Sequence, residues 1–403
     1  MKSCYNTAKR FSIALFLYST LFYSVGFTVS VYSSDAGNAW QDRQVQTVQA
    51  TARADALNVY GGSARHKVAA PGFFRVLEKS NRWWLLDPEG CLYFSIGVNS
   101  VAPGRVGSTD LNAWAQDTYS LLKDAGFNSL GRWSDHKPFQ NIGKNIPWCA
   151  SHSFMKDYAN KRPAKYGEAR FPNETLPVFD EAWPIFCASY AKENAGPLKD
   201  DVWLLGHFSD NELPFRPDAL KKYLALPVDD AGHIAAAKWM QENRIRDRDV
   251  DDAEVQAAFL YVVAKRYYDA VAAALKQADP NHLYIGSRLH GRCISEPVIK
   301  AAGACDVVSI NYYHRWEAER ERTKSWTKWS QKPFLVGEFY AMTVPKDKAV
   351  PKSSGAGFRV LNYEDAGDFY QHYTKSLLKD IPNCVGWHWF KYADDNPISR
   401  KGI

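Results

Sequence analysis

The 403-residue sequence predicts an α/β protein, and within that class a (β/α)8 TIM barrel. Short, nearly continuous apolar runs recur along the chain, which is typical of strands buried on both faces of a sheet. Helical patterns alternate with these runs, as they do around a parallel sheet. Eight runs can be counted, which favours a closed barrel. A doubly wound sheet is disfavoured, because the first run leads into Gly97-Val98-Asn99-Ser100, which has one glycine where a phosphate-binding turn needs several.

The elements follow in order from Pro71. Residues 73–76 and 82–87 predict an N-terminal β-hairpin, and Asp87-Pro88-Glu89-Gly90 is a turn sequence. The predicted barrel strands are 92–98, 127–133, 146–154 (the weakest), 202–208, 283–288, 306–311, 333–338 and 385–390. The predicted helices are 110–125, 180–194, 253–278, 295–303, 315–330 and 365–380. The last strand ends near Phe390, so the final barrel helix is expected to be missing, either replaced in part by the hairpin and arm or lost to a shortened reading frame.

The first 36 residues differ in kind from the rest. Lys2, Lys9 and Arg10 precede an apolar stretch over 11–32, and small residues follow at 34–36. This pattern predicts a signal peptide over 1–36 and a secreted or periplasmic protein, with a retained membrane anchor as the alternative. Residues 37–70 are polar and rich in Ala, Gln and Ser, which indicates a linker or N-terminal arm. The barrel is then expected over 71–403.

Composition and motifs exclude several classes of protein. The formal charge of +6 is mild and there is no Lys/Arg run, so no nucleic-acid partner is expected. None of the seven cysteines stands in a C-x-x-C pair, and no Walker A or H-E-x-x-H motif occurs, so neither a metal nor a cofactor is expected. Export permits disulfides, and buried free thiols are the alternative. The aromatic fraction of 14% suits stacking on sugar rings, although large cores also use aromatic residues.

Two glutamates stand at predicted strand ends, where barrel enzymes carry their reactive groups. Glu212 follows the fourth strand and Glu338 ends the seventh. Two carboxylates that face one cleft are what hydrolysis of a glycosidic bond needs, because one protonates the leaving oxygen while the other attacks the anomeric carbon or activates water. A separation of about 5–5.5 Å between them would mean retention of configuration through a covalent glycosyl-enzyme.

Other strand-end residues are predicted to bind substrate in the same cleft. We expect Asn211 to bond a sugar hydroxyl, Tyr312 to orient Glu338, and Trp389 to form the stacking floor of the subsite. For each aromatic residue, packing in the barrel is the alternative. For His290, contact with a sugar and burial as a hydrogen-bonded histidine are equally favoured. The predicted substrate-binding residues are Asn99, Arg132, Trp133, Asn211, His290, Tyr312 and Trp389. Further strand-end residues that fit this cleft are Arg288, Asn311, Tyr313, Trp387, His388 and Lys391.

Three stretches carry a resemblance to a known family: 83–100 (WWLLDPEG and FSIGVNS), 205–212 (LGHFSDNE) and 386–392 (GWHWFKY). They resemble glycoside hydrolase family 50, the β-agarases, within clan A of retaining barrel enzymes. The resemblance implies that Glu212 is the acid/base, that Glu338 is the nucleophile, and that the substrate bond is the β-1,4 link from galactose to 3,6-anhydro-L-galactose. The sequence departs from the family at Gly337 and Tyr340, where those agarases have Ser and His, and it ends where they continue.

The sequence therefore predicts an exported retaining glycoside hydrolase that cleaves β-galactosidic links of a red-algal galactan, with agarose as the first candidate and no membrane contact after signal cleavage. Two alternatives stay open: a non-catalytic carbohydrate-binding protein on a degenerate barrel, and a retaining β-galactosidase-type enzyme that acts on another polysaccharide. Endo or exo action depends on whether the 213–252 insertion and the 341–364 loop close one end of the cleft. The insertion is a lid or an oligomer contact.

Overall fold

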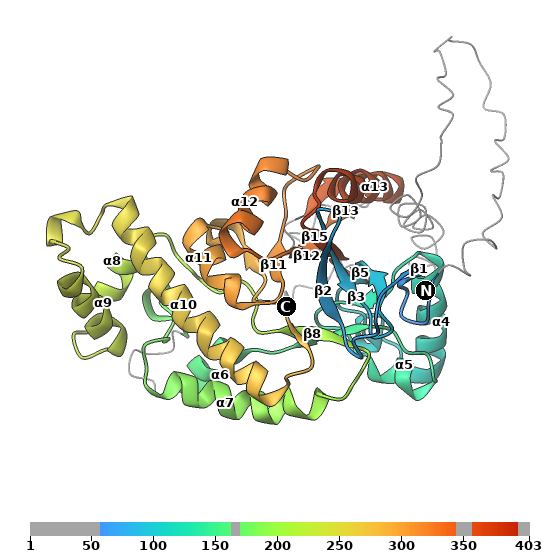
Figure 1. The fold of residues 1–403 in the computed structure, drawn as a ribbon, viewed down its shortest axis with the longest axis horizontal. Helices are drawn as coiled ribbons and strands as arrows, with labels where there is room; N and C mark the ends of the chain where they lie inside the picture. The colour runs from blue at the N-terminus through green and yellow to red at the C-terminus, as the bar shows by residue number, and fades with distance from the viewer. Residues whose placement is uncertain (1–56, 163–169, 344–356, 394–403) are drawn as a thin grey trace, which may run out of the picture.

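The structure, a computed structural model, describes residues 57–162, 170–343 and 357–393 (Figure 1). It confirms the α/β class: a curled parallel sheet of nine strand segments lies at the centre, consistent with a TIM-like barrel, and helices cover it. The predicted signal peptide over 1–36 and the expected absence of a final helix, at 394–403, lie outside the described residues. Among the described helices, none is long and apolar enough to cross a membrane.

The central sheet contains a strand from each of the eight predicted runs. Its order is β10-β11-β12-β15-β5-β6-β7-β8-β9, and every pair is parallel. The segments at the two ends of this order, β9 and β10, belong to one continuous stretch, 283–290, so both edges of the sheet meet there. The bounds are β5 (Ser95–Val98), β6 (Ser129–Leu130), β7 (Trp148–Ser151), β8 (Leu204–Phe208), β9 (Leu283–Tyr284), β10 (Leu289–His290), β11 (Val308–Asn311), β12 (Phe334–Phe339) and β15 (Cys384–Trp389).

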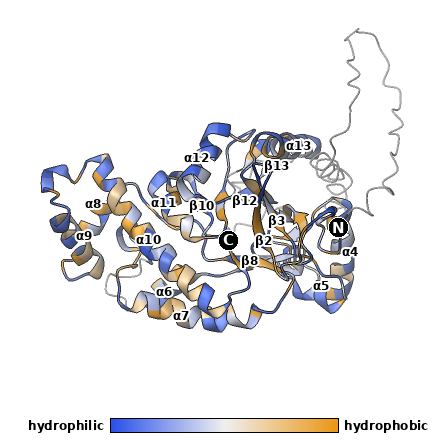
Figure 2. Ribbon diagram, viewed as in Figure 1, coloured by the Kyte–Doolittle hydropathy of each residue, from blue (hydrophilic) through white to orange (hydrophobic). Residues whose placement is uncertain are grey.

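Helices lie outside the sheet, and each of the six predicted helical ranges contains one. Side chains cap the first turns of some of these helices: Asp110 accepts from the backbone N–H of Ala113, and Asp252 accepts from those of Glu254 and Val255. Figure 2 shows apolar residues on the central strands and polar ones on the outer faces of helices such as α9 and α12, the pattern that drives helices onto a sheet. The bounds are α4 (Leu111–Asp124), α5 (Lys137–Asn141), α6 (Phe154–Lys161), α7 (Ala182–Asn194), α8 (Ala219–Leu224), α9 (Ala231–Glu242), α10 (Ala253–Ala278), α11 (Glu296–Ala301), α12 (Arg320–Ser330) and α13 (Tyr363–Asp380).

Two smaller sheets flank the central one. An antiparallel sheet has the order β1-β4-β3-β2, with β1 (Ser63–Lys67), β2 (Arg75–Lys79), β3 (Arg82–Leu86) and β4 (Cys91–Tyr93). A pair of parallel strands, β13 (Ala341–Thr343) and β14 (Phe358–Val360), follows β12. Leu85 and Tyr93 of the antiparallel sheet, with Phe74 just before β2, pack in one cluster with residues near the amino ends of barrel strands, so this sheet covers the end of the barrel opposite the predicted site. Those strand residues are Leu205, Leu283, Ile285, Val307, Leu335 and Val385.

Ordered structure starts earlier than Pro71, where the sequence placed it. Strand β1 (Ser63–Lys67) pairs with β4, and the buried ring of Tyr60 contacts Phe74 and Trp203. The sequence of β1 lacks the apolar alternation that marks a strand, so it was not predicted. Backbone pairing to the edge of β4, rather than a hydrophobic face of its own, holds this segment in the sheet. Part of the expected linker over 37–70 is therefore a strand of the antiparallel sheet.

Candidate active site

The two glutamates come from the strand ends that the sequence indicated, and they lie in different surroundings. Glu338 belongs to β12 and is 4% exposed. Glu212 lies just beyond the end of β8, and its side chain is 35% exposed. Asn311, which is in register with Glu338 on the neighbouring strand, donates to Glu212, so the two carboxylates lie at one site. The charge of Glu212 is accordingly among the influences that raise the pKa of Glu338.

Two donors bind the carboxyl oxygens of Glu338. The Arg288 guanidinium donates from Nη2 to Oε1 at 2.5 Å, and the Tyr313 hydroxyl donates to Oε2. Burial raises the pKa of Glu338 above its usual value of 4.5, while the Arg288 charge and the Tyr313 hydrogen bond oppose that rise. Burial and the charge of Glu338 also raise the pKa of Tyr313, so its hydroxyl stays protonated as a donor. A fixed, ionised carboxylate is what a nucleophile requires.

Arg288 itself is packed between aromatic rings. Its side chain is fully buried, and its guanidinium carbon lies 4.8 Å from the ring centroid of Trp133 and 5.2 Å from that of Phe208. Its Nη2 also donates to the Gly337 carbonyl at 3.0 Å. These contacts fix the cation beside Glu338, and its ion pair with that carboxylate offsets the cost of burying both charges.

Glu212 is held more loosely. Asn311 donates from Nδ2 to Oε1 at 2.8 Å, and Nδ1 of His290 lies 3.9 Å from the same oxygen. The backbone N–H of Glu212 donates to the Arg288 carbonyl at 3.3 Å. Among the described residues, the second carboxylate oxygen has no hydrogen-bond partner, and the side chain reaches solvent. This carboxyl is therefore placed to exchange a proton with a bound molecule or with water.

The strand ends around this site are strained. Five residues other than glycine have positive φ there, a conformation that costs about 1–3 kcal/mol each unless the surroundings hold it. For Glu212, whose φ is +53°, the hydrogen bond to the Arg288 carbonyl helps to hold it. Such strain clusters at functional sites. The five are Ser100, Trp133, Glu212, Arg288 and His314.

Two of the predicted substrate-binding residues instead position the segments that carry the glutamates. Arg132 is 3% exposed and donates to the backbone carbonyls of Asp210 (3.0 Å) and His152 (2.8 Å). The first of these contacts fixes the backbone segment that leads to Glu212. Asn99 is fully buried and donates to the carbonyl of Gly337 at 2.9 Å, beside Glu338. Neither side chain is open to a substrate.

Three other predicted residues do lie at the open side of the site. Trp133 is 40% exposed, and Phe390 meets its ring edge-to-face at 6.1 Å between centroids. The side chain of His290 is 35% exposed beside Glu212. Asn211, next to Glu212, is partly exposed, but its Oδ1 is buried and has no hydrogen-bond partner in the described part of the chain. Phe390 was not singled out from the sequence, although its place directly after β15 is the signal that could have found it.

Two predicted roles are wrong. Tyr312 does not orient Glu338: its hydroxyl donates to Glu319 at 2.5 Å, and Tyr313 makes the contact with Glu338 instead. Successive side chains along a strand point to opposite faces, so Tyr312 turns outward to α12 while its neighbours turn inward. Trp389 is no stacking floor, because it is 7% exposed and packs against aromatic rings of the core. Those rings are Phe339, Tyr340, Phe369 and Tyr370.

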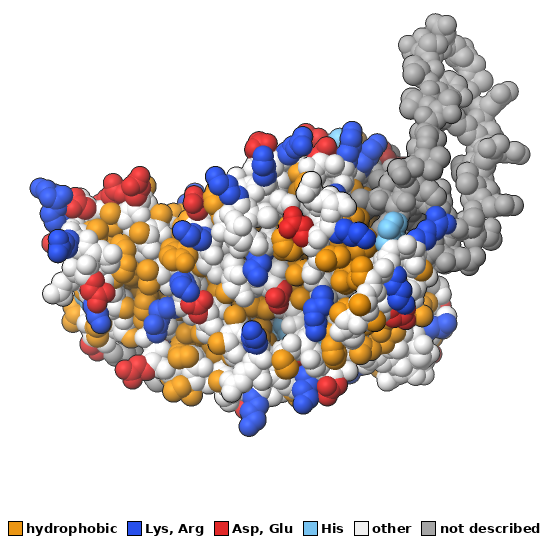
Figure 3. Space-filling model, viewed as in Figure 1, with side chains coloured by type: hydrophobic (Ala, Val, Ile, Leu, Met, Phe, Trp, Pro, Cys, Tyr) orange, Lys and Arg blue, Asp and Glu red, His pale blue; other side chains and the backbone are white. Residues whose placement is uncertain are grey.

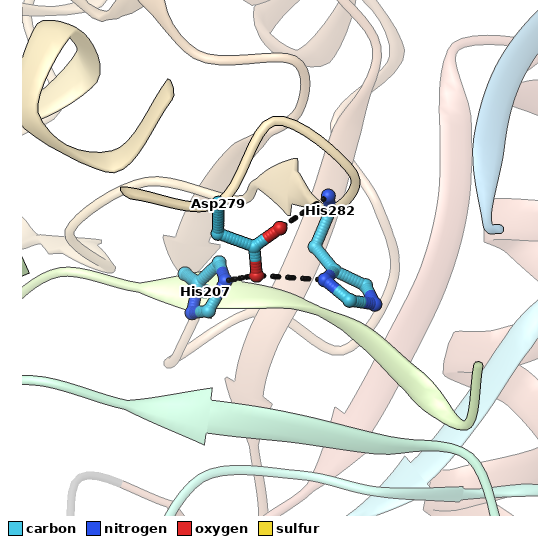
Figure 4. A group of neighbouring side chains, drawn as sticks. All are labelled: His207, Asp279 and His282. Carbon is cyan, nitrogen blue, oxygen red and sulfur yellow. Dashed lines mark hydrogen bonds and ion pairs between the residues drawn. The ribbon is translucent and has the colours of Figure 1, made fainter. Parts of the chain in front are cut away.

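Within the described residues, one group of side chains has the composition of a metal site: His207, Asp279 and His282 (Figure 4). Asp279 and His282 precede β9, at the end of the barrel away from the glutamates. Asp279 Oδ2 accepts from His207 Nε2 at 2.8 Å and from His282 Nδ1 at 2.7 Å. The remaining ring nitrogens also have partners. Nδ1 of His207 lies 2.9 Å from Nε2 of His152, and Nε2 of His282 lies 2.9 Å from the Asp201 carbonyl oxygen. Hydrogen bonds thus account for every polar atom of this cluster.

The Asp279 carboxylate is expected to stabilise the fold strongly. Burial alone would raise its pKa, but hydrogen bonds from His207 and His282 outweigh burial and hold the pKa well below its usual value of 3.8. Asp279→Asn should therefore lower the free energy of unfolding by about 3–5 kcal/mol at pH 7, because it breaks a buried pair. Urea denaturation measures this change.

The sign of the pH dependence follows from the lowered pKa. The stabilisation is complete above the usual carboxyl pKa of 3.8 and is lost as the pH falls toward the lower value of the folded state. Asp269→Asn is the control, since Asp269 lies on α10, the helix that ends just before Asp279, in an exposed pair with Lys265. If Asp279→Asn lowers the free energy of unfolding no more than Asp269→Asn does, this account of the Asp279 carboxylate is wrong.

A buried and a half-exposed glutamate stand at strand ends of a TIM-like barrel, and two carboxyl groups at one site are what hydrolysis of a glycosidic bond needs. The chain is 32% identical to the solved structure of BpGH50, covering 89% of this chain and 82% of that one, with a TM-score of 0.76. The chain belongs to glycoside hydrolase family 50.

Other relatives agree with this assignment. The solved agarase AgWH50C has the same fold, with 20% identity over 88% of this chain and 64% of its own, and a TM-score of 0.67. Beta-agarase B of Vibrio sp. (strain JT0107) is 22% identical over 92% of this chain, and beta-agarase A of that strain is 24% identical over 72%. The chain spans 51% and 33% of the lengths of these two agarases. No family model matches the chain.

Proposed function

We propose that this protein is a retaining, agarase-like glycoside hydrolase that cleaves β-galactosidic links of a red-algal galactan, with agarose as the first candidate. The observation that carries the proposal is the contrast between the two glutamates. Glu338 is buried with two donors on its oxygens, whereas Glu212 is half-exposed with one. Different environments suit two carboxyl groups to different roles in one reaction.

In the first step of the proposed reaction, Glu338 attacks the anomeric carbon and the bond from that carbon to the leaving oxygen breaks. Glu212 gives its proton to that oxygen, so the leaving sugar departs as a neutral alcohol. In the second step Glu212 takes a proton from water, and the resulting hydroxide displaces Glu338 with a second inversion. Arg288 and Tyr313 hold Glu338 in line and stabilise it when it leaves as a carboxylate.

The exposed aromatic edge of the site suits a sugar ring. Trp133 and Phe390 offer apolar faces beside Arg288, on which the C–H groups of a galactose unit can stack. Asn211 and His290 are placed to bond hydroxyl groups. On the face of the molecule shown in Figure 3, basic and acidic side chains are interspersed.

The proposal includes the finer organisation of the chain. Residues 1–36 act as a signal peptide, so the mature protein is secreted or periplasmic. The arm over 37–70 leads to the barrel and contributes strand β1 to the antiparallel sheet, and 71–403 form the catalytic barrel. The stretch 283–290 serves as the single fifth strand of a (β/α)8 barrel, because β9 pairs with β8 and β10 pairs with β11.

Product analysis on a substrate panel tests the proposed function. The wild-type protein is incubated with agarose, porphyran and an aryl β-galactoside, and the released sugars are separated and identified. We expect oligosaccharides with galactose at the new reducing end from at least one galactan. A protein that binds a galactan but releases no sugar from any of the three would be a carbohydrate-binding protein instead.

A further inference from the structure

Asn311 lies between the two glutamates. It is the last residue of β11, is 1% exposed, and is in register with Glu338 of the neighbouring strand. Its Nδ2 donates to Glu212 Oε1 at 2.8 Å, and its Oδ1 lies 3.4 Å from Arg288 Nε. The amide thus connects the acid/base carboxyl to the arginine that binds Glu338.

The orientation of this amide is fixed by chemistry. A guanidinium only donates hydrogen bonds, so the atom that faces Arg288 must be the carbonyl oxygen Oδ1. The NH₂ group must then face Glu212. Gly337 leaves the room for this arrangement, because a Cβ at that position would come within 2.8 Å of Asn311 Oδ1. The direction of the hydrogen bond to Glu212 therefore follows from its neighbours.

A donor on one oxygen of a carboxyl group decides where the acidic proton sits. A protonated carboxyl has one O–H oxygen and one carbonyl oxygen. Because Asn311 presents an N–H to Oε1 and a carbonyl oxygen is the stronger acceptor of the two, this contact favours Oε1 as the carbonyl oxygen and Oε2 as the oxygen that carries the proton. The same hydrogen bond is retained after Glu212 loses its proton, since a carboxylate oxygen also accepts.

We propose that Asn311 is a positioning residue that assigns the transferable proton of Glu212 to Oε2, the oxygen that then protonates the leaving group. This inference rests on the proposed function, in which Glu212 is the acid. It predicts that Asn311 matters most where the leaving oxygen needs a proton and least where it does not.

Leaving-group dependence separates this role from a structural one. In Asn311→Asp the side chain still accepts from Arg288 but no longer donates to Glu212. We expect kcat/KM to fall roughly 10- to 100-fold for a phenyl β-galactoside, whose leaving group needs protonation, and far less for the dinitrophenyl glycoside, which leaves unaided. Tyr312→Phe is the matched control, since its hydroxyl meets Glu319. It should leave both substrates unaffected.

An equal loss of kcat/KM on both glycosides in Asn311→Asp, or no loss on the phenyl glycoside, would overturn the role of Asn311. A wild-type protein inactive on both glycosides and on galactans would overturn the proposed function, and this inference with it. Should Asn311→Asp fail to fold, Asn311→Ala provides the same comparison. A crystal structure of the wild type at atomic resolution supplies an independent measurement: the Cδ–Oε2 bond of protonated Glu212 should be longer than Cδ–Oε1, and the reverse order would contradict the assignment.

Discussion

Glu338→Gln is expected to reduce kcat by roughly 10⁴-fold or more on whichever galactan the wild type hydrolyses, because an amide oxygen does not displace the leaving group. The fold should survive, since the glutamine carbonyl still accepts from Arg288 and the Tyr313 hydroxyl can accept from the new NH₂ group. Reducing-sugar release measures the rate, and pull-down on insoluble galactan shows whether binding persists.

The control for Glu338→Gln is the same change at another glutamate. Glu319 has a side chain that is 43% exposed and bonds Tyr312 outside the site. Glu319→Gln should therefore keep wild-type turnover. If Glu338→Gln retains a tenth of the wild-type rate, Glu338 is not the nucleophile and the role we give it is wrong.

Glu212→Gly is expected to separate the two steps of the reaction. Loss of the acid should lower the rate of hydrolysis of a substrate with a poor leaving group by about 10²- to 10⁴-fold. The dinitrophenyl glycoside should still form the glycosyl-enzyme, which then accumulates because no general base activates water. Added azide should restore turnover and give β-galactosyl azide, because a small anion needs no general base.

Glycine is the informative replacement at this position. The backbone of Glu212 has a φ of +53°, which glycine adopts without strain, so the variant should be at least as stable as the wild type. A loss of activity then reports the missing carboxyl rather than unfolding. Formation of α-galactosyl azide, or the absence of any azide effect, would contradict the assignment of Glu212 as the acid/base.

The sequence was sufficient to predict the barrel strands and both glutamates. Strands buried on both faces are nearly continuous apolar runs, and a barrel directs reactive residues to the ends of these runs. Glu212 lies just beyond β8 and Glu338 lies near the end of β12, so position along the chain was enough to single them out. No contact between distant residues had to be known.

The environment of the glutamates was harder to predict, because it depends on which face each side chain takes. Tyr312 and Tyr313 are chemically alike neighbours, and only the exact end of β11 decides which of them meets Glu338. Arg288 comes from the stretch that joins β9 to β10, where the strand is interrupted and the backbone has positive φ. Sequence periodicity does not reveal such an irregularity.

The most direct test of the central claim, hydrolysis with retention through Glu338, is the configuration of the first product. Proton NMR in D₂O can follow the reducing-end galactose released from a galactan oligosaccharide before mutarotation mixes the anomers. The account predicts that the β-anomer appears first and that the α-anomer grows in later. Initial release of the α-anomer would mean a single displacement by water and would contradict the role of Glu338 as a nucleophile.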